Sequence, residues 1–241
     1  MKVFGISDLH LTKSRPEKSM DRFGPEWHNH EERLATQWIS RISSRDIVVI
    51  AGDTSWANDI KDSKKDFEFL SQLPGRKIVG VGNHDYWWQS QTYSNNKFAE
   101  WGMKDIYALR NSSVILDGVQ MCSVKGYMLD TSPMYSEEVN GKNRRRELNR
   151  LNITLNNLDP NYQGKTILAI HHPPMLTDNV DSDVRKMITE SVVSHCIYGH
   201  MHQDGAKLVV EGDFDGVNYA FVAADRKSMI PHLIMEVEEL E

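Results

Sequence analysis

Acidic, amide and imidazole side chains recur in five short segments that are spread along the chain. The segments are Ser7-Asp8-Leu9-His10, Gly52-Asp53, Gly82-Asn83-His84-Asp85, His171-His172-Pro173 and Gly199-His200-Met201-His202. Carboxylate and imidazole groups together suit divalent first-row metals such as manganese, iron or zinc. Because the segments offer more ligands than one ion needs, the pattern predicts two metals with a carboxylate between them, an arrangement that can clamp a phosphate.

Each of these segments follows a short apolar run rich in β-branched residues, which is typical of a buried strand. We expect such strands over Lys2–Ile6, Ile47–Ala51, Lys77–Val81 and Thr166–Ile170, and another that ends at Tyr198. Ligands of open α/β sheets bind outside the carboxyl ends of the strands. The strand ends should therefore bring the polar side chains to one edge of the fold.

Helical and antiparallel elements connect these strands. Apolar residues at helical spacing predict helices over Glu31–Ile42, Ile60–Leu73 and Gln91–Trp101, so strands and helices alternate as in a layered α/β core. Antiparallel pairs are expected in the second half: Ser113–Leu116 with Val119–Val124 across Asp117-Gly118, and Lys207–Val210 with Val217–Val222. No linker divides the chain, so we expect residues 1–241 to form a single domain with mixed sheets.

The composition narrows the class of protein. A chain of 241 residues buries enough surface to fold without disulfides, and its only cysteines, Cys122 and Cys196, stand in apolar strand-like runs. Two buried thiols are typical of a reducing compartment. No apolar run approaches the roughly 20 residues of a membrane span. We therefore expect a cytoplasmic protein without a membrane partner.

The charge distribution bears on the partner. The net charge of −6 disfavours long nucleic acid as a partner, since proteins that grip it across their surface are basic. One exception stays open, because Arg144-Arg145-Arg146 lies on a predicted helix and could bind phosphates locally. Such runs are more often a solvated helix face. Small phosphorylated substrates fit the net charge better.

The ordered series SDLH, GD, GNHD, HHPP and GHMH resembles the calcineurin-like metallophosphoesterase superfamily over nearly the whole chain. The stretches GPEW, GDTSWA and GNHDYWW also resemble a bacterial subgroup of predicted phosphohydrolases. The resemblance implies an α/β fold, a four-layer αββα sandwich of two mixed β-sheets flanked by helices. It further implies a metal-dependent phosphoesterase that hydrolyses phosphate ester bonds.

The resemblance also implies a role for each matching residue. Asp53 would bridge two divalent ions, and a hydroxide bound between them would attack phosphorus in line. Two sets of ligands would complete the centre, namely Asp8, His10 and His202 for the first ion and Asn83, His171 and His200 for the second.

His84 would face the substrate as the catalytic histidine. It would stabilise charge on the phosphoryl group or protonate the leaving group, two roles that the sequence leaves open. Asp85 is a candidate to orient it, with a loop hydrogen bond as the alternative. Between the two adjacent histidines we expect His171 to be the ligand, because it stands directly at the strand end, while His172 is a candidate substrate contact.

The substrate is less closely defined. Ser/Thr protein phosphatases of the superfamily have a GDxVDRG segment, whereas Gly52–Asn58 reads GDTSWAN, so protein phosphatase activity is disfavoured. Further candidate substrate contacts are Trp27 and His30 in the long first loop and Lys125 after a strand. We expect a small, nucleotide-like phosphomonoester or phosphodiester as substrate. The alternatives are a metal-dependent nuclease and a non-catalytic metal-binding scaffold.

Overall fold

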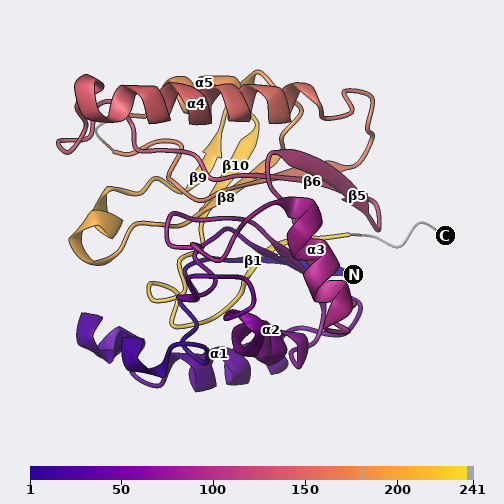
Figure 1. Ribbon diagram of the computed structural model, residues 1–241. Coiled ribbons are helices and arrows are strands. Elements are labelled where there is room, and N and C mark those ends of the chain that lie inside the picture. The colour runs from indigo at the N-terminus through magenta and orange to yellow at the C-terminus, as the bar shows by residue number, and fades with distance from the viewer. Residues whose placement is uncertain (178, 181, 238–241) are drawn as a thin grey trace.

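The computed structural model describes residues 1–177, 179–180 and 182–237. Within these residues two β-sheets pack face to face, and helices cover the outer face of each sheet (Figure 1). The layers therefore follow one another as helix, sheet, sheet and helix. This is the αββα sandwich that the sequence resemblance implies.

The first sheet has the strand order β11-β1-β2-β3-β4 in the described part of the chain. Neighbouring strands from β1 to β4 are parallel, and β11 pairs antiparallel with β1, so the sheet is mixed. The strands are β1 (Lys2–Ile6), β2 (Ile47–Ile50), β3 (Arg76–Val79), β4 (Ile106–Ala108) and β11 (His232–Glu236).

The second sheet has the described strand order β5-β6-β7-β8-β10-β9. Strands β6, β7, β8 and β10 are parallel, while β5 and β9 close the two edges as antiparallel strands. The strands are β5 (Ser112–Leu116), β6 (Val119–Val124), β7 (Lys165–Ile170), β8 (His195–Tyr198), β9 (Gly212–Phe214) and β10 (Val217–Phe221).

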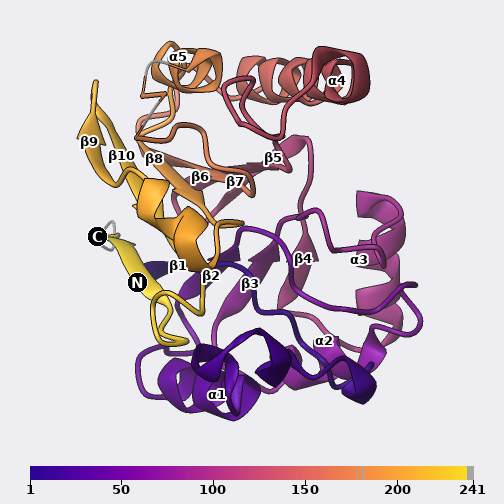
Figure 2. The ribbon, with the colours of Figure 1, turned by 90° about the vertical axis from the view of Figure 1, so that its left-hand side faces the viewer.

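Helices of the first half lie against the first sheet, and those of the second half against the second sheet (Figure 2). The first group is α1 (His30–Ile39), α2 (Lys64–Ser71) and α3 (Gln91–Glu100), and the second is α4 (Glu137–Asn156) and α5 (Asp183–Thr189). Short 3₁₀ helices complete the described elements: η1 (Pro16–Lys18), η2 (Met20–Phe23), η3 (Pro25–Trp27) and η4 (Gln203–Leu208). No described helix has the length and apolar character needed to cross a bilayer.

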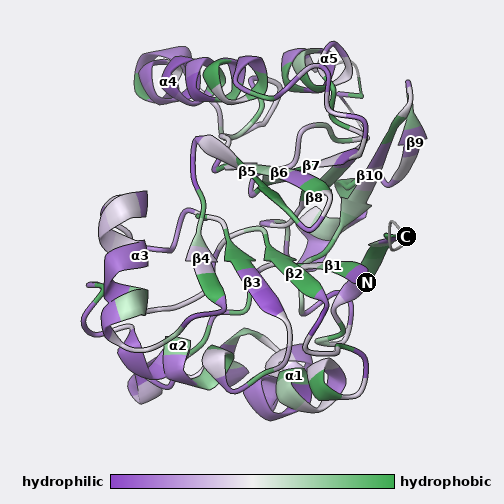
Figure 3. Cartoon of the chain, turned by 90° about the vertical axis from the view of Figure 1, so that its right-hand side faces the viewer, coloured by the Kyte–Doolittle hydropathy of each residue, from purple (hydrophilic) through white to green (hydrophobic). Residues whose placement is uncertain are grey.

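The alternation of side chains along β2 shows how one strand serves two hydrophobic layers. Ile47 and Val49 face the second sheet, whereas Val48 and Ile50 face the helices. Successive side chains of a strand point to opposite faces, so a strand buried on both faces is apolar throughout. Figure 3 accordingly shows hydrophobic segments in the strands, while the outer helices mix hydrophilic and hydrophobic residues.

One expected strand is wrong. Lys207 and Leu208 end the 3₁₀ helix η4, and the strand that pairs with β10 is β9, which begins only at Gly212. The reason is the turn: Asp215 and Gly216 both have positive φ, 49° and 81°, as a two-residue hairpin loop requires. The Asp-Gly pair therefore places the antiparallel partner directly before residue 215.

Candidate metal centre

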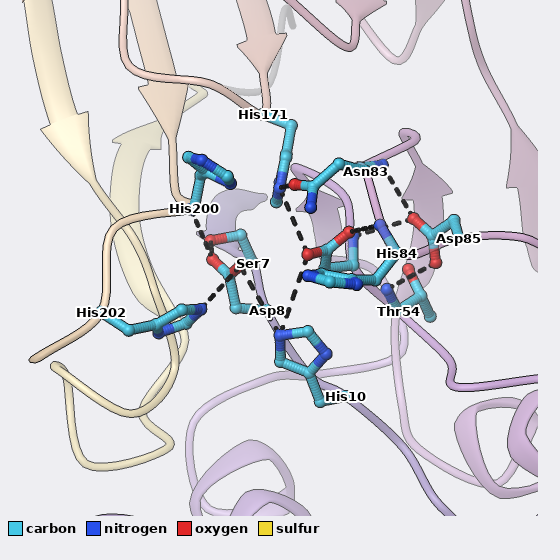
Figure 4. Close-up of polar contacts among 12 residues, drawn as sticks. Ser7, Asp8, His10, Thr54, Asn83, His84, Asp85, His171, His200 and His202 are labelled. Carbon is cyan, nitrogen blue, oxygen red and sulfur yellow. Dashed lines mark hydrogen bonds and ion pairs between the residues drawn. The ribbon is translucent and has the colours of Figure 1, made fainter. Parts of the chain in front are cut away.

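The predicted ligands come together at one edge of the two sheets (Figure 4). They stand on the segments that follow β1, β2, β3, β7 and β8, so both sheets contribute. Hydrogen bonds join these segments: the amide of Asp8 donates to the carbonyl of Gly52, and that of His10 donates to the carbonyl of Asp53, each at 3.0 Å. The strand ends thus form one connected frame for the side chains.

Four of the predicted ligands have left-handed backbone conformations. The φ angles are 57° for Asp8, 44° for His10, 52° for Asp53 and 72° for His200. Such conformations cost free energy in residues other than glycine and gather at functional sites, where the surrounding structure holds them. Here they turn the chain sharply after each strand, so that the side chains meet above the sheet edge.

Asp8 presents one free carboxylate oxygen to the centre. Its Oδ2 accepts hydrogen bonds from the Ser7 hydroxyl at 2.6 Å and from the His200 amide at 3.0 Å. Its Oδ1 is buried without a hydrogen-bond partner among the described residues, 3.4 Å from His202 Nε2 and 4.0 Å from His10 Nε2. A buried anionic oxygen with two imidazole nitrogens beside it has the chemistry of a cation ligand.

Asp53 divides its two oxygens in a similar way. Oδ1 accepts a hydrogen bond from the His84 amide at 2.8 Å. Oδ2 lies 3.3 Å from His171 Nε2 and 3.8 Å from His10 Nε2, so this one oxygen faces imidazoles of both predicted ligand sets. Among the described residues, two groups bring their ligand atoms within 4.8 Å of one another and could hold a metal ion, Asp8-His10-His202 and Asp8-Asp53-His171.

His171 is oriented from behind by the backbone. Its Nδ1 lies 3.0 Å from the carbonyl oxygen of Ala51, which can only accept, so Nδ1 carries the proton. Nε2 is then free to bind a cation. The Asn83 side-chain oxygen lies 2.8 Å from this Nε2, and the His200 ring lies 5.1 Å from the His171 ring, so the second predicted ligand set is also assembled.

The charges of the centre favour bound cations. Burial opposes ionisation of Asp8 and Asp53, yet the surrounding imidazoles hold the pKa of both carboxyl groups below the usual range. Burial alone would also lower the pKa of His171 and His202, but the neighbouring carboxylates raise it to about 9 and about 10. These carboxylates and imidazoles thus stabilise each other's charge, and a divalent cation would take the place of the protons on the two imidazoles.

Asp225 lies behind His202, and sequence reasoning missed it. Its Oδ2 is 3.1 Å from His202 Nδ1, on the side of the ring opposite the nitrogen that faces Asp8. Carboxylates in this position orient metal-binding histidines and raise their basicity. Asp225 follows β10, and nothing in the local sequence FVAADRK marks it as part of the centre.

Asp85 binds backbone rather than the ring of His84. Its carboxylate accepts hydrogen bonds from four amides and from the Trp87 indole, at 2.7 to 3.3 Å. The amides belong to Gly82, Asp53, Thr54 and Ser55. Asp85 therefore ties the segments after β2 and β3 together, which is the loop hydrogen-bonding alternative.

Glycines allow these segments to approach closely. A Cβ on Gly82 would collide with the Asp53 carboxylate, and one on Gly199 would collide with Ser7 Oγ and Asp8 Oδ2. Side chains at either position would displace the carboxylates. Close packing against these side chains thus explains why glycine begins both GNHD and GHMH.

The imidazole of His84 lines a cavity beside the candidate metal ligands. The cavity has a volume of about 190 Å³, and Trp27 forms part of its wall. The His84 ring lies 4.8 Å from the Trp56 ring and 5.7 Å from the His10 ring, with no side-chain hydrogen bond in the described part of the chain. It is thus positioned to meet a bound substrate.

The other three candidate substrate contacts lie outside this cavity. His30 is buried with Nε2 3.2 Å from the carbonyl oxygen of His10, where it supports the loop that carries this predicted ligand. Lys125 is 3.8 Å from Glu147 of α4. His172 is buried with its ring 3.9 Å from that of His200. Substrate contact by these residues stays a prediction.

Comparisons with known proteins agree with this fold. The family model of the calcineurin-like phosphoesterases matches residues 1–204. The chain therefore belongs to the calcineurin-like phosphoesterase family, whose members are metal-dependent hydrolases of phosphate esters. A search of curated proteins found no match.

Two similar solved structures are distant in sequence from this chain. The phosphopantetheinyl hydrolase PptH from Mycobacterium tuberculosis is 15% identical, with a TM-score of 0.59 over 100% of this chain and 98% of that one. A protein of unknown function from Aquifex aeolicus is 16% identical, with a TM-score of 0.47 over 96% of this chain and 95% of that one. At such identities the likeness extends to the fold alone.

Proposed function

We propose that this chain is a dinuclear metal-dependent phosphohydrolase that cleaves a small phosphomonoester or phosphodiester. The observation that carries the proposal is the position of Asp53 Oδ2 between His171 and His10, at 3.3 and 3.8 Å from their Nε2 atoms. A single carboxylate oxygen that faces two sets of imidazoles is suited to bridge two cations. Although burial opposes ionisation, the imidazoles around Asp8 and Asp53 lower the pKa of both carboxyl groups, so both side chains keep a negative charge in this environment.

The chain's own residues divide the work as follows. Asp8, His10 and His202 would hold one cation, Asn83, His171 and His200 would hold the other, and Asp53 would contribute to both. Bound manganese, iron or zinc would activate water as a nucleophile and neutralise the phosphoryl oxygens. His84 donates a hydrogen bond or a proton toward the phosphoryl group and its leaving oxygen, since its imidazole faces the cavity.

The size of the cavity supports a small substrate. About 190 Å³ is less than the roughly 300–1,000 Å³ of pockets for drug-sized ligands. PptH, the structural neighbour, is by its name a hydrolase of a phosphopantetheinyl group, which supports a small phosphorylated substrate here as well.

The nuclease alternative finds less support. In the basic run of α4, Arg144 pairs with Asp183 at 2.6 Å and Arg145 pairs with Glu137. Carboxylates on the same surface thus neutralise much of the charge that would attract a polyanion. The scaffold alternative requires the loss of ligands or of His84, whereas two groups of possible metal ligands occur among the described residues and His84 lines the cavity beside them.

Hydrolysis by metal-stripped and reloaded protein tests the proposal. The substrates are p-nitrophenyl phosphate and bis-p-nitrophenyl phosphate, and the variants are Asp53→Ala and His84→Ala. We expect turnover to return with manganese or zinc and to fall by about 10²–10⁴-fold in His84→Ala. Elemental analysis should find two ions per chain in wild type and in His84→Ala, and fewer in Asp53→Ala.

The two variants separate the possible failures. Loss of metal in His84→Ala would mean that this residue is a ligand rather than a catalytic group. Wild-type protein that binds no divalent metal would contradict the proposal altogether. Full activity of Asp53→Ala would contradict the bridging role.

A further inference from the structure

Two chemically different sets of residues line the cavity beside His84, one at its floor and one in its walls. Residues of the candidate metal centre form the floor, and the walls come from three segments outside it, of which the start of η4 contributes Gln203. The segment η1–η3 contributes Met20, Phe23 and Trp27, and the loop after β2 contributes Trp56. These four wall residues are apolar or aromatic, and Gln203 is the polar member of the wall in the described part of the chain.

Contacts across the cavity hold these walls in place. The Trp56 indole donates to the sulfur of Met20 at 3.1 Å, and the Gln203 side chain donates to the carbonyl of Phe23 at 3.3 Å. Trp56 also stacks on His10, with ring centroids 5.0 Å apart. These hydrogen bonds attach η2 to the loop after β2 and to the start of η4, so this part of the cavity wall is held in place.

The wall carries no positive charge. Neither lysine nor arginine is among the described residues that line the cavity, and the nearby Lys18 directs its ammonium group over the Trp56 ring at 4.7 Å. Inside the cavity a second phosphate or another anionic group would lose its hydration, and no lysine or arginine among the described lining residues would replace it. An uncharged ring loses little hydration free energy in the cavity, and it gains binding free energy from burial and from stacking on the aromatic walls.

We propose that the enzyme selects esters of a single phosphate whose organic group is uncharged and aromatic, and that Phe23 and Trp56 are the specificity residues that receive this group. The inference rests on the proposed function, since the phosphate is placed at the metal centre. Phe23 is 44% exposed at the rim, so its ring is available for a ligand, whereas Trp27 is 2% exposed and packs as the rear wall.

Matched esters test the preference in turnover. Benzyl phosphate and cyclohexylmethyl phosphate have rings of similar size and alkoxide leaving groups, and differ in aromaticity. Glycerol phosphate and an alkanediol bisphosphate supply polar and charged groups. We expect kcat/KM to fall in the order benzyl, cyclohexylmethyl, glycerol and bisphosphate, with the differences mainly in KM.

Binding supplies a readout that does not depend on turnover. Calorimetry with benzylphosphonate and methylphosphonate on the metal-loaded protein compares the same phosphonate with and without the ring. In Phe23→Ala we expect benzylphosphonate to bind about five- to tenfold more weakly, while methylphosphonate binding is unchanged. Tyr107→Ala is the matched control, because Tyr107 is an aromatic residue of β4 that is 42% exposed and does not line the cavity.

The outcomes separate this inference from the proposed function. Failure to hydrolyse any ester would contradict the proposed function. The comparison of benzylphosphonate with methylphosphonate would still test whether the cavity wall binds the aromatic ring. Hydrolysis of all four esters with equal kcat/KM, or preference for the bisphosphate, would overturn the inference alone. Equal loss of benzylphosphonate binding in Tyr107→Ala and Phe23→Ala would also overturn it.

Discussion

The imidazole of His202 is held between two carboxylates from distant parts of the chain. Asp8 faces Nε2 at 3.4 Å, and Asp225 faces Nδ1 at 3.1 Å. Asp225 is almost fully buried, so its charge acts on His202 with little screening by water. A ring fixed in this way has one nitrogen committed to the protein and the other directed at the metal centre.

Replacement of Asp225 should weaken the centre without removing a ligand. In Asp225→Ala, His202 loses the carboxylate that lies 3.1 Å from its Nδ1 and raises the basicity of the ring, so we expect metal affinity to fall by about 10–100-fold. Competition calorimetry with a chelator measures the change. Asp204→Ala is the control, since Asp204 also carries one negative charge on a neighbouring segment but is exposed and pairs with Lys207 at 2.6 Å. Equal losses in both variants would indicate a general charge effect.

Some residues of the centre could be predicted from the sequence, and others could not. Asp8, His10, Asn83 and the others stand directly at strand ends, where residue type and position are both visible in the chain. Asp225 and Ser7 act through contacts that only the folded backbone creates, so no spacing rule marks them. Asp85 was visible as a candidate, yet its choice between the His84 ring and loop amides depends on how two loops meet.

At the scale of elements, the loops after β2 and β3 share one anchor. Asp85 satisfies four backbone amides and the Trp87 indole from a position that is 6% exposed. Those amides belong to the segments that carry Asp53 and Asn83. The geometry of two candidate ligands therefore depends on one carboxylate that touches no metal site directly.

Asp85→Ala should lower both stability and metal affinity. Because buried amides would be left without acceptors, we expect a loss of about 3 kcal/mol in the free energy of unfolding. Urea denaturation of metal-free protein measures this loss, and calorimetry measures metal binding. The exposed Asp62→Ala should leave both unchanged. A stable Asp85→Ala protein with normal affinity would show that the loops hold their conformation without this anchor.

Asp46 anchors the beginnings of β1 and β2 at the opposite end of the first sheet. Its carboxylate accepts hydrogen bonds at 2.8 Å from the Lys2 amide and from both the amide and the hydroxyl of Ser43. Burial would raise the pKa of Asp46, but these hydrogen bonds outweigh it and lower the pKa below the usual value. Asp46 is 5% exposed, so the anchor is largely shielded from water.

This lowered pKa predicts a pH-dependent contribution to stability. The stabilisation is complete above the unfolded-state pKa of about 3.9 and is lost as the pH falls through the lower folded-state value. We expect Asp46→Asn to cost about 1–3 kcal/mol at pH 7 and progressively less below about pH 4. Urea denaturation from pH 7 to pH 3 measures the difference, with the exposed Glu32→Gln as control. A difference that stays constant with pH would exclude the ionised carboxylate as its source.

Elements were predictable where one local signal dominated. The strand Val119–Val124 has the expected bounds, since Asp117-Gly118 defines the turn before it. Strand β9 was missed because the apolar run Leu208–Val210 was preferred to the second Asp-Gly pair at Asp215-Gly216. The 3₁₀ helices η1–η3 have no periodicity long enough to detect, and in η2 and η3 the buried Met20 and Trp27 pack over the site.

At the scale of the whole molecule, three hydrophobic clusters follow the four layers. The middle cluster joins residues of both sheets, such as Val49 and Ile78 of the first and Met121 and Ile197 of the second. Each sheet therefore covers one face of the other, and neither half of the chain alone can exclude water from its hydrophobic core. The metal centre extends this dependence, because its ligands also come from both sheets. We propose on this basis that the chain folds as a single domain.

The distribution of tryptophan makes this proposal measurable. All six tryptophans precede residue 102 and report on the first sheet and its helices, at positions 27, 38, 56, 87, 88 and 101. The longest described helix, α4 with 20 residues, covers the second sheet and dominates the helical circular dichroism of the second half. Fluorescence thus follows the first half of the chain alone, whereas circular dichroism reports the helices of both halves.

A single domain should lose both signals together when metal-free protein unfolds in urea. Small domains that unfold in one cooperative step give coincident transitions by different probes. The variant Leu151→Ala sharpens the test, because Leu151 of α4 is 1% exposed and its truncation should cost about 2–5 kcal/mol. We expect the fluorescence midpoint to fall as far as the dichroism midpoint, although every tryptophan lies in the other half. If part of the dichroism transition moved to lower urea while the fluorescence midpoint stayed in place, the two sheets would unfold independently, and the single-domain proposal would be wrong.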